Sequence, residues 1–355
     1  LINERIKLIM AYTTINKSTD HFNTKIYTGT GTTTTFTGVG FQPDWCWFKA
    51  RNFADPHQLY DSVRGVHKYV RSNENSAEGD DSGSLQAFTS DGFTLGNSGN
   101  VNGGTSQNLV AWNWKAGTTT IPTGGSLDAT AVSINTTSGF GIYKYTGDGA
   151  GVRSIAHGLG SIPKMMIIKR LNSTRDWAVY HASLPLADHL ELNNTDAATA
   201  ANIWWSSRPT SSLIYFNGDG QVNGGSDPYI MYAFAEKQGY SKFGSYVGNG
   251  NADGSFVYTG FKPAFVMIKP YTHAIGWSMI DNKRDSENNG TTSMLKANST
   301  STEDDNAAYN IEFLSNGFKN RNTNSSLNNP GYGHIYMAFA EAPLVGTNNV
   351  PATAR

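Results

Sequence analysis

The chain has 355 residues, more than one domain usually holds, so two or three domains are expected. Only 15% of the residues are charged and the net charge is −1, which excludes a charge-rich disordered chain and a basic surface for nucleic acid or an anionic membrane. Aromatic residues at 12%, together with 38 glycines, favour an all-β protein with tight turns, and the single cysteine excludes an intrachain disulfide.

Residues 1–24 are predicted to form a short N-terminal arm. Its apolar stretch is too short for a signal peptide or a membrane helix. Met10 opens a segment that resembles a translation start, so residues 1–9 read as an upstream extension. We therefore expect the chain to be made in a cytoplasm.

Three landmarks then recur in the same order three times. The first is Tyr-x-Gly-x-Gly, at residues 27–31, 145–149 and 246–250. The second is Gly-x-x-Pro, at residues 40–43, 160–163 and 260–263, each followed by an apolar run ending at Lys49, Lys169 or Lys269. The third is an apolar closing strand, at residues 109–114, 230–235 and 335–340. Such ordered recurrence indicates an internal repeat.

Each repeat predicts a β-sandwich of roughly 100 residues, jelly-roll or concanavalin-like, because short apolar runs alternate with Asp-Gly and Asn-Gly turns. The predicted modules are residues 25–117, 139–238 and 239–343. A Thr-, Ser- and Gly-rich linker is placed at 118–138, and a C-terminal tail at 344–355. The runs 165–168 and 265–268 indicate central strands, and residues 184–192 are the best candidate for one short helix.

Exposed tryptophan would stack on a sugar or anchor a protein interface, whereas buried tryptophan would fill the sandwich. For Trp112, whose place is taken by Tyr232 and Met337 in the other copies, packing in the core or between modules is favoured. Trp204 and Trp205 lie in a polar, loop-like stretch. We take Trp204, Trp205 and Arg208 as the candidate ligand-binding residues.

A glycan hydrolase needs two carboxylates across a cleft, and no apolar strand carries such a pair. No nucleophile elbow or phosphate loop occurs, so no catalytic residue is assigned and the chain is expected not to be an enzyme. Asp61 with Arg64 and Asp281 with Arg284 share one spacing. A structural salt bridge is favoured for both pairs, with a ligand-binding pair as the alternative.

No histidine has the spacing of a metal ligand, so no metal site is assigned. Residues 303–305 are acidic and are expected in a solvated loop, with a weak Ca²⁺ loop as the alternative. Asn249, Asn251 and Asp253 alternate like half of a calcium loop but lack its final glutamate, so turn chemistry is favoured. No cofactor is expected, and Ca²⁺ remains the alternative.

Several phrases carry a likeness to known sequences: residues 10–18, Asp-Ser-Val-Arg-Gly at 61–65, residues 90–96, 242–269 and 343–349. They resemble a family of virion proteins from tailed bacteriophages, especially marine ones. The resemblance covers nearly the whole chain from Met10. It implies a virion location, homo-oligomers, other phage structural proteins as partners, and tail-fibre-associated or other particle-surface proteins with concanavalin-type or jelly-roll modules.

The expected function is therefore a tail fibre or fibre-like appendage whose lectin-like modules bind a host surface glycan or a virion protein. One alternative is a capsid decoration protein without a host ligand. Another is a glycan depolymerase, against which the missing carboxylate pair counts. Because the landmarks explain the fold, recognition is expected in the segments that differ between copies: residues 55–81, 181–208 and 281–305.

Overall fold

The structure is a computed structural model that describes residues 12–200, 205–285 and 288–345. Strands dominate the described chain, with one four-residue α-helix and two three-residue 3-10 helices. The all-β sandwich prediction is confirmed. Among the described residues, no helix is long and apolar enough to cross a membrane.

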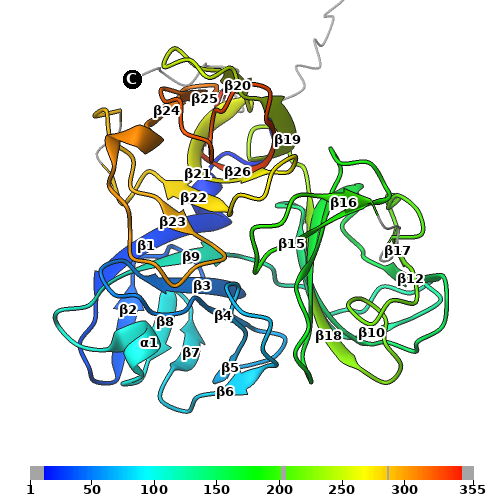
Figure 1. Ribbon diagram of the computed structural model, residues 1–355. Coiled ribbons are helices and arrows are strands. Elements are labelled where there is room, and N and C mark those ends of the chain that lie inside the picture. The colour runs from blue at the N-terminus through cyan, green and yellow to red at the C-terminus, as the bar shows by residue number, and fades with distance from the viewer. Residues whose placement is uncertain (1–11, 201–204, 286–287, 346–355) are drawn as a thin grey trace, which may run out of the picture.

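The strands fall into three groups, which we call the first, second and third modules (Figure 1). The first has a large sheet of β1 (Phe22–Thr28), β9 (Asn108–Trp114), β3 (Trp45–Ala50) and β4 (Gln58–Asp61), a small sheet of β2 (Thr34–Thr37), β8 (Gly92–Leu95) and β7 (Leu85–Thr89), the pair β5 (Lys68–Tyr69) and β6 (Gly79–Asp80), and helix α1 (Gly99–Asn102).

The second and third modules repeat this plan of one large and one small sheet. The second has β10 (Ala129–Asn135), β11 (Phe140–Thr146), β18 (Pro228–Ala235), β13 (Pro163–Arg170), β14 (Ala178–His181), β15 (Asp188–Glu191) and β16 (Thr199–Ala200), with β12 (Arg153–Ala156) and β17 (Leu213–Phe216) in the small sheet. The third has β19 (Ser241–Val247), β26 (Gly333–Pro343), β21 (Phe261–Pro270), β22 (Ser278–Asp281) and β23 (Leu295–Lys296), with β20 (Phe256–Tyr258), β25 (Gly317–Asn320) and β24 (Ile311–Leu314) in the small sheet. The 3-10 helices are η1 (Ser18–Asp20) and η2 (Ala307–Tyr309).

Each large sheet is covered on both faces. Side chains alternate along a strand, so Trp45 and Trp47 of β3 point one way, and Cys46 and Phe48 the other. The first pair belongs to an apolar cluster shared by all three modules, and the second to the core of the first module alone. All six residues of β3 are therefore buried, which confirms that the apolar runs are central strands.

The shared cluster, which we call the central core, lies where the three large sheets face one another (Figure 1). Trp45 of the first module stacks on Tyr232 of the second, with ring centroids 4.3 Å apart. Phe22 of the first module stacks on Phe339 of the third at 5.1 Å. Trp112 is fully buried there, so its predicted packing role is confirmed.

A buried asparagine explains the Tyr-x-Gly-x-Gly landmark. In the third module, Asn328 accepts the backbone N–H of Asn249 at 3.0 Å, and its own carbonyl accepts the N–H of Gly250 at 2.8 Å. Gly250 has φ +67°, and a Cβ on Gly248 would meet the Asn329 oxygen at 2.2 Å, so both positions require glycine. Asn102 and Asn223 hold the loops of the first and second modules in the same way.

The structure adds detail to three of the predicted segments. The linker at 118–138 contains β10, which pairs with β11 and extends the second module's sheet. The described part of the arm packs against the protein: Tyr12 donates to the Gly260 carbonyl at 2.9 Å, and Ile15 lies in the central core. The predicted helix at 184–192 is wrong, because that segment includes the turn that leads into β15. Residues 1–11 of the arm and 346–355 of the tail lie outside the described residues.

Candidate functional site

Three seams join the modules, and an equivalent backbone hydrogen bond crosses each. Glu78 N–H donates to the Leu171 carbonyl at 2.8 Å across the first–second seam, Ala198 N–H to Tyr271 at 2.7 Å across the second–third seam, and Glu303 N–H to Arg51 at 2.7 Å across the third–first seam. The backbone arrangement therefore repeats around the central core, and the seams differ in their side chains.

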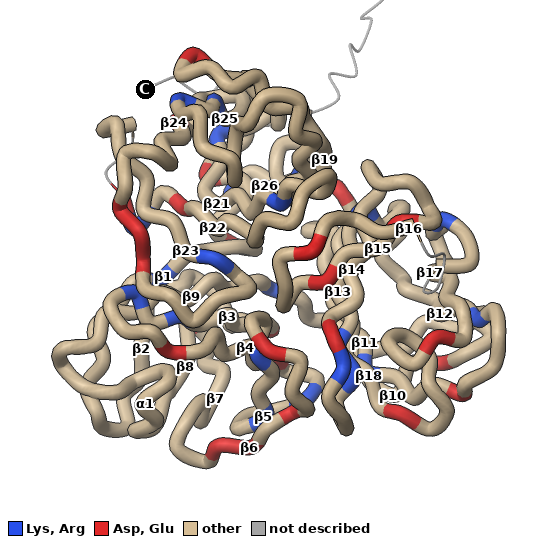
Figure 2. The backbone as a smooth tube through the Cα atoms, in the orientation of Figure 1, with Lys and Arg blue, Asp and Glu red and all other residues tan. Residues whose placement is uncertain are grey.

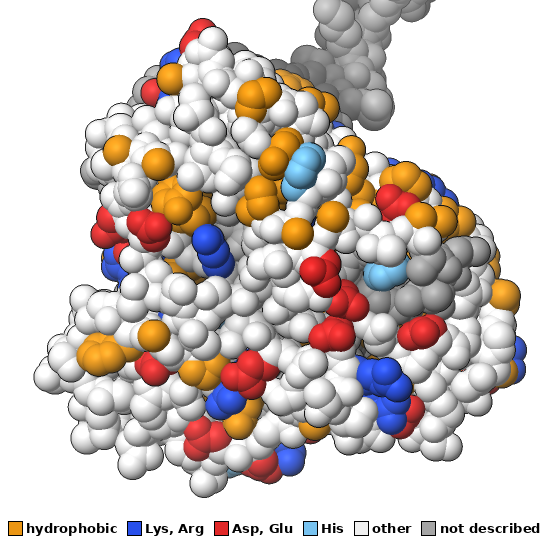
Figure 3. All heavy atoms as spheres, viewed as in Figure 1, with side chains coloured by type: hydrophobic (Ala, Val, Ile, Leu, Met, Phe, Trp, Pro, Cys, Tyr) orange, Lys and Arg blue, Asp and Glu red, His pale blue; other side chains and the backbone are white. Residues whose placement is uncertain are grey.

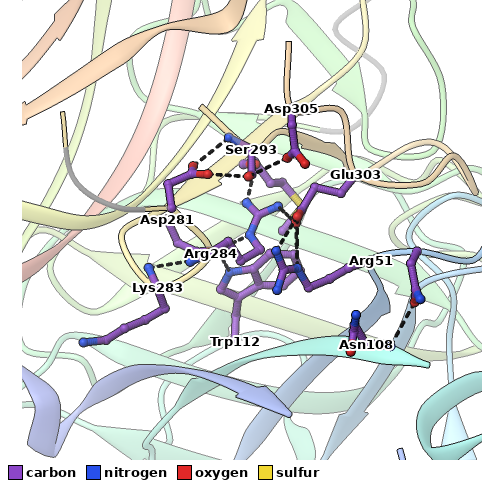
Figure 4. A network of polar contacts seen from close by, with 12 residues as sticks. Arg51, Asn108, Trp112, Asp281, Lys283, Arg284, Ser293, Glu303 and Asp305 are labelled. Carbon is purple, nitrogen blue, oxygen red and sulfur yellow. Dashed lines mark hydrogen bonds and ion pairs between the residues drawn. The ribbon is translucent and has the colours of Figure 1, made fainter. Parts of the chain in front are cut away.

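The third–first seam carries the network of polar contacts in Figure 4. The Asp281 carboxylate at the end of β22 accepts the indole N–H of Trp112 at 2.9 Å and the Arg284 Nε–H at 2.6 Å. Arg284 Nη1 donates to Glu303 at 2.9 Å. Arg51 Nε donates to the same Glu303 carboxylate at 2.9 and 3.0 Å. Trp112 of β9 and Arg51, the residue after β3, thus tie the first module to the third.

Charge in this network is balanced and held away from water. The side chains of Asp281 and Arg284 are fully buried, and that of Glu303 is 7% exposed. Burial lowers the pKa of Arg284, but the neighbouring carboxylates of Asp281 and Glu303 outweigh it and leave that pKa raised. Asp281 also accepts the backbone N–H groups of Lys283 and Arg284, which fixes the turn that presents the guanidinium.

The first–second seam has a similar network, in which Leu171 takes the place of Arg51. Tyr232 donates its hydroxyl to Asp61 at 2.8 Å, Arg64 Nε donates to Asp61, and Arg64 Nη1 lies 3.3 Å from Glu78. The salt bridges predicted for Asp61–Arg64 and Asp281–Arg284 are confirmed, and both are buried.

Across the second–third seam, the described residues form no such ion pairs. His181 stands in the place of Asp61 and Asp281, and its Nε2 lies 3.1 Å from the Tyr336 carbonyl. Burial lowers the pKa of His181 to about 4, so the ring is neutral near pH 7. Leu184 and Ala198 take the places of the arginine and the glutamate and pack against the central core.

The divergent segments, where recognition was expected, also supply contacts between modules. Parts of residues 55–81, 181–208 and 281–305 form the seams, where each is matched to one neighbouring module. Their differences encode packing between modules, so divergence between copies does not by itself mark recognition.

Two polar grooves flank residues 301–305 on the third–first seam, in the notch between the first and third modules at the left of Figure 3. Their volumes are about 380 and about 340 Å³. Asp304 and Asp305 are exposed, as the solvated-loop prediction requires, but that prediction is wrong for Glu303, which is a buried link between modules.

The chemistry of this seam is that of positioning. Both Glu303 oxygens accept guanidinium N–H groups, which leaves this carboxylate no free site for a substrate proton. Ser293 contacts both Asp285 and Asp305, and burial raises the pKa of Asp285. Among the described residues, no group of three His, Cys, Asp or Glu side chains is placed to hold a metal ion.

The structure describes two of the three predicted ligand-binding residues, Trp205 and Arg208. Trp205 is buried in the core of the second module, with its ring edge-on to Tyr180 at 5.4 Å, so its assignment as an exposed stacking residue is wrong. Arg208 is exposed, but its guanidinium donates to the Tyr180 hydroxyl and to the carbonyls of Ala182 and Leu184. Trp204 lies outside the described residues.

The half-calcium pattern forms turns. Asn249 Oδ1 accepts the N–H of Asn251 at 3.0 Å, and Asn251 Oδ1 accepts the N–H of Asp253 at 2.9 Å. Asp253 is paired with Lys319 and Arg321, each at 2.7 Å. The favoured turn chemistry is therefore confirmed.

Sequence reasoning missed a second set of seam contacts. His57, Trp177 and Trp277 precede equivalent strands, and their ring nitrogens reach carbonyls of the neighbouring modules, at Lys296, Arg71 and Glu191. Burial lowers the pKa of Lys49, Lys169 and Lys269 to about 8, and each ammonium group donates to backbone carbonyls. The lysine that ends each apolar run in all three copies was the sequence signal for these buried contacts with backbone carbonyls.

Charges of both signs are interspersed along the backbone, and neither sign gathers on one module (Figure 2).

A family model described as "Domain of unknown function (DUF7483)" matches residues 17–343, so the chain belongs to this family. No curated protein and no solved structure matches the chain.

Proposed function

We propose that this member of the DUF7483 family is a virion surface protein of a tailed bacteriophage. In this proposal it is a fibre-like appendage that acts by binding and without catalysis. The observation that carries the proposal is the central core, around which three modules are locked by equivalent seams. Such a body presents its outer faces in fixed relative positions, as attachment at a particle surface requires. The resemblance to phage virion proteins supplies the setting.

The test is the position of the protein on the particle. Labelled antibody against the full chain, or density in an assembled virion, should place it on the tail. Label confined to the capsid faces would overturn the fibre proposal. Absence of the protein from purified particles would overturn the virion proposal as a whole.

A capsid decoration protein is the second candidate, and one observation favours it. The described tryptophans Trp45, Trp47, Trp112, Trp114, Trp177, Trp205 and Trp277 are all buried, so none offers a host-binding platform. Removing the gene product and measuring capsid stability separates the two roles. Capsids that break at lower temperature without it, with unchanged adsorption to host cells, would favour decoration.

Binding without catalysis has its own test. Purified protein is incubated with host polysaccharide, and reducing ends are measured over time. No release above the buffer control is expected. Release that grows with protein concentration would overturn the proposal that the chain is not an enzyme.

A further inference from the structure

The outer face of the third module's small sheet differs in kind from the rest of the described surface. On β20, Phe256 is 46% exposed and Tyr258 is 53% exposed, while Val257 between them is buried in the module's core. The two rings therefore share one face of the strand, with their Cα atoms roughly 7 Å apart. In the part of the chain that the structure describes, no other two exposed aromatic side chains are separated by a single residue.

The neighbouring strands complete a shallow platform. Phe256 lies opposite Lys319 on β25, and Tyr258 lies opposite Gly317. Gly317 has no side chain to cover the rings, and a Cβ there would approach the Phe256 Cε2 atom to 3.1 Å. Gly317 therefore leaves the backbone of β25 uncovered beside the aromatic side chains of β20.

Polar groups with balanced charge form its rim. Asp253 is paired with both Lys319 and Arg321, and Arg321 Nε is paired with Glu312 at 2.7 Å. Two cations and two carboxylates leave no net charge to attract an anionic ligand. The Lys319 ammonium has further N–H donors beside this pair, and the Asp253 carboxylate, whose side chain is 73% exposed, has further acceptor sites for hydroxyl groups.

The other modules provide an internal comparison. The first module's small sheet has Thr35 and Thr37 at the positions of Phe256 and Tyr258, and Gly92 at the position of Gly317. The second has Ser154 and Ala156, and the backbone of Leu127 pairs with Ser154 there. The backbone plan is shared, so the aromatic pair is a property of the third module alone.

We propose that the face formed by Phe256, Tyr258, Gly317 and Lys319 binds a neutral pyranose glycan, whose apolar ring faces stack on the aromatic rings while its hydroxyl groups bond to the rim. This rests on the proposed role in attachment and names the site and the ligand class. Two half-exposed aromatic side chains offer about 200 Å². That is far below the ~800 Å² that each partner of a stable protein interface buries, and it fits a small ligand.

The experiment uses the full chain on an array of bacterial surface polysaccharides and neutral hexose oligosaccharides. The strongest oligosaccharide is then measured by saturation-transfer NMR. Phe256→Ser with Tyr258→Ser should weaken binding by about tenfold or more, because both stacking faces are lost. Phe256→Tyr and Tyr258→Phe keep the rings and should retain binding. The matched control, Thr35→Ser with Thr37→Ser on the first module, should leave it unchanged.

Three outcomes would overturn the inference: no glycan bound by the unaltered chain, equal binding by the Ser variants, or equal loss in the first-module control. If the Ser variants keep glycan binding but fail to enter particles, the face is a protein interface instead. Particle location is measured separately, so failure here leaves the virion proposal standing, and absence from particles does not alter the array result.

Discussion

The third–first seam allows a sharp test, because the second–third seam supplies an uncharged template for it. Arg284→Leu removes a fully buried guanidinium that pairs with Asp281 and Glu303. Arg51 still contacts Glu303, but among the described residues no cation other than Arg284 is paired with Asp281. Removing one partner of a buried pair costs about 3–5 kcal/mol, since the remaining charge stays buried without compensation. We expect the free energy of unfolding to fall by that amount.

The compensated variant follows from the template. Asp281→His, Arg284→Leu and Glu303→Ala together reproduce the set His181, Leu184 and Ala198. No carboxylate then remains buried without a partner, and Arg51, which is 23% exposed, can turn to water. The triple variant should therefore be more stable than Arg284→Leu alone by about 2 kcal/mol or more.

Urea unfolding followed by tryptophan fluorescence measures both variants, with Lys283→Ala as the control because it changes a neighbouring side chain without touching the network. The reasoning fails if Arg284→Leu lies within about 1 kcal/mol of the unaltered chain. It also fails if the triple variant is the less stable of the two, because the cost would then come from shape and not from unpaired charge.

The remaining predictions concern the seams and loops. Burial lowers the pKa of His57 to about 3 and of His181 to about 4, both below the unfolded value of about 6.5. The contribution of these rings to stability should therefore be complete above pH 6.5, and the free energy of unfolding should fall by up to about 1.4 kcal/mol per pH unit for each ring as the pH drops toward 4. Replacing both histidines by Gln should flatten that slope in an acid titration. Asn328→Ala should lower the unfolding free energy by about 1–3 kcal/mol, measured by urea, because the buried side chain bonds Asn249 and other loop groups; an unchanged midpoint would refute this. A protease site inserted after the exposed Thr123 should be cut without separating the fragments on native gel filtration, since the central core holds both; two separate peaks would contradict it.

The all-β class and the central strands could be predicted from sequence because each depends on local pattern. A run such as residues 165–168 has apolar side chains at consecutive positions, and only a strand covered on both faces buries all of them. The turn role of Asn249 and Asn251 was equally local, because each side chain bonds the backbone two residues ahead.

The seams could not be predicted, because they depend on which module lies beside which. Trp205 shows the limit in one residue. The wider stretch around it is polar and loop-like, but strands on either side of that stretch bury it, through Tyr180 of β14 and Phe216 of β17. Glu303 shows it in the other direction, since an acidic stretch gives no sign that one carboxylate faces Arg51 of another module.

The side chains of the three seams also explain how three similar modules adopt one order around the core. Asp61 and Asp281 each need a donor from the closing strand of the next module, and Tyr232 and Trp112 supply it. The third module has Met337 at that position, which offers no N–H or O–H donor. His181 meets a backbone carbonyl there instead, a contact that either partner sequence would allow. Placing Asp61 or Asp281 against Met337 would leave a buried carboxylate without one hydrogen-bond donor. The two aspartates therefore disfavour packing of their modules against the third module's closing strand, whereas His181 is compatible with it.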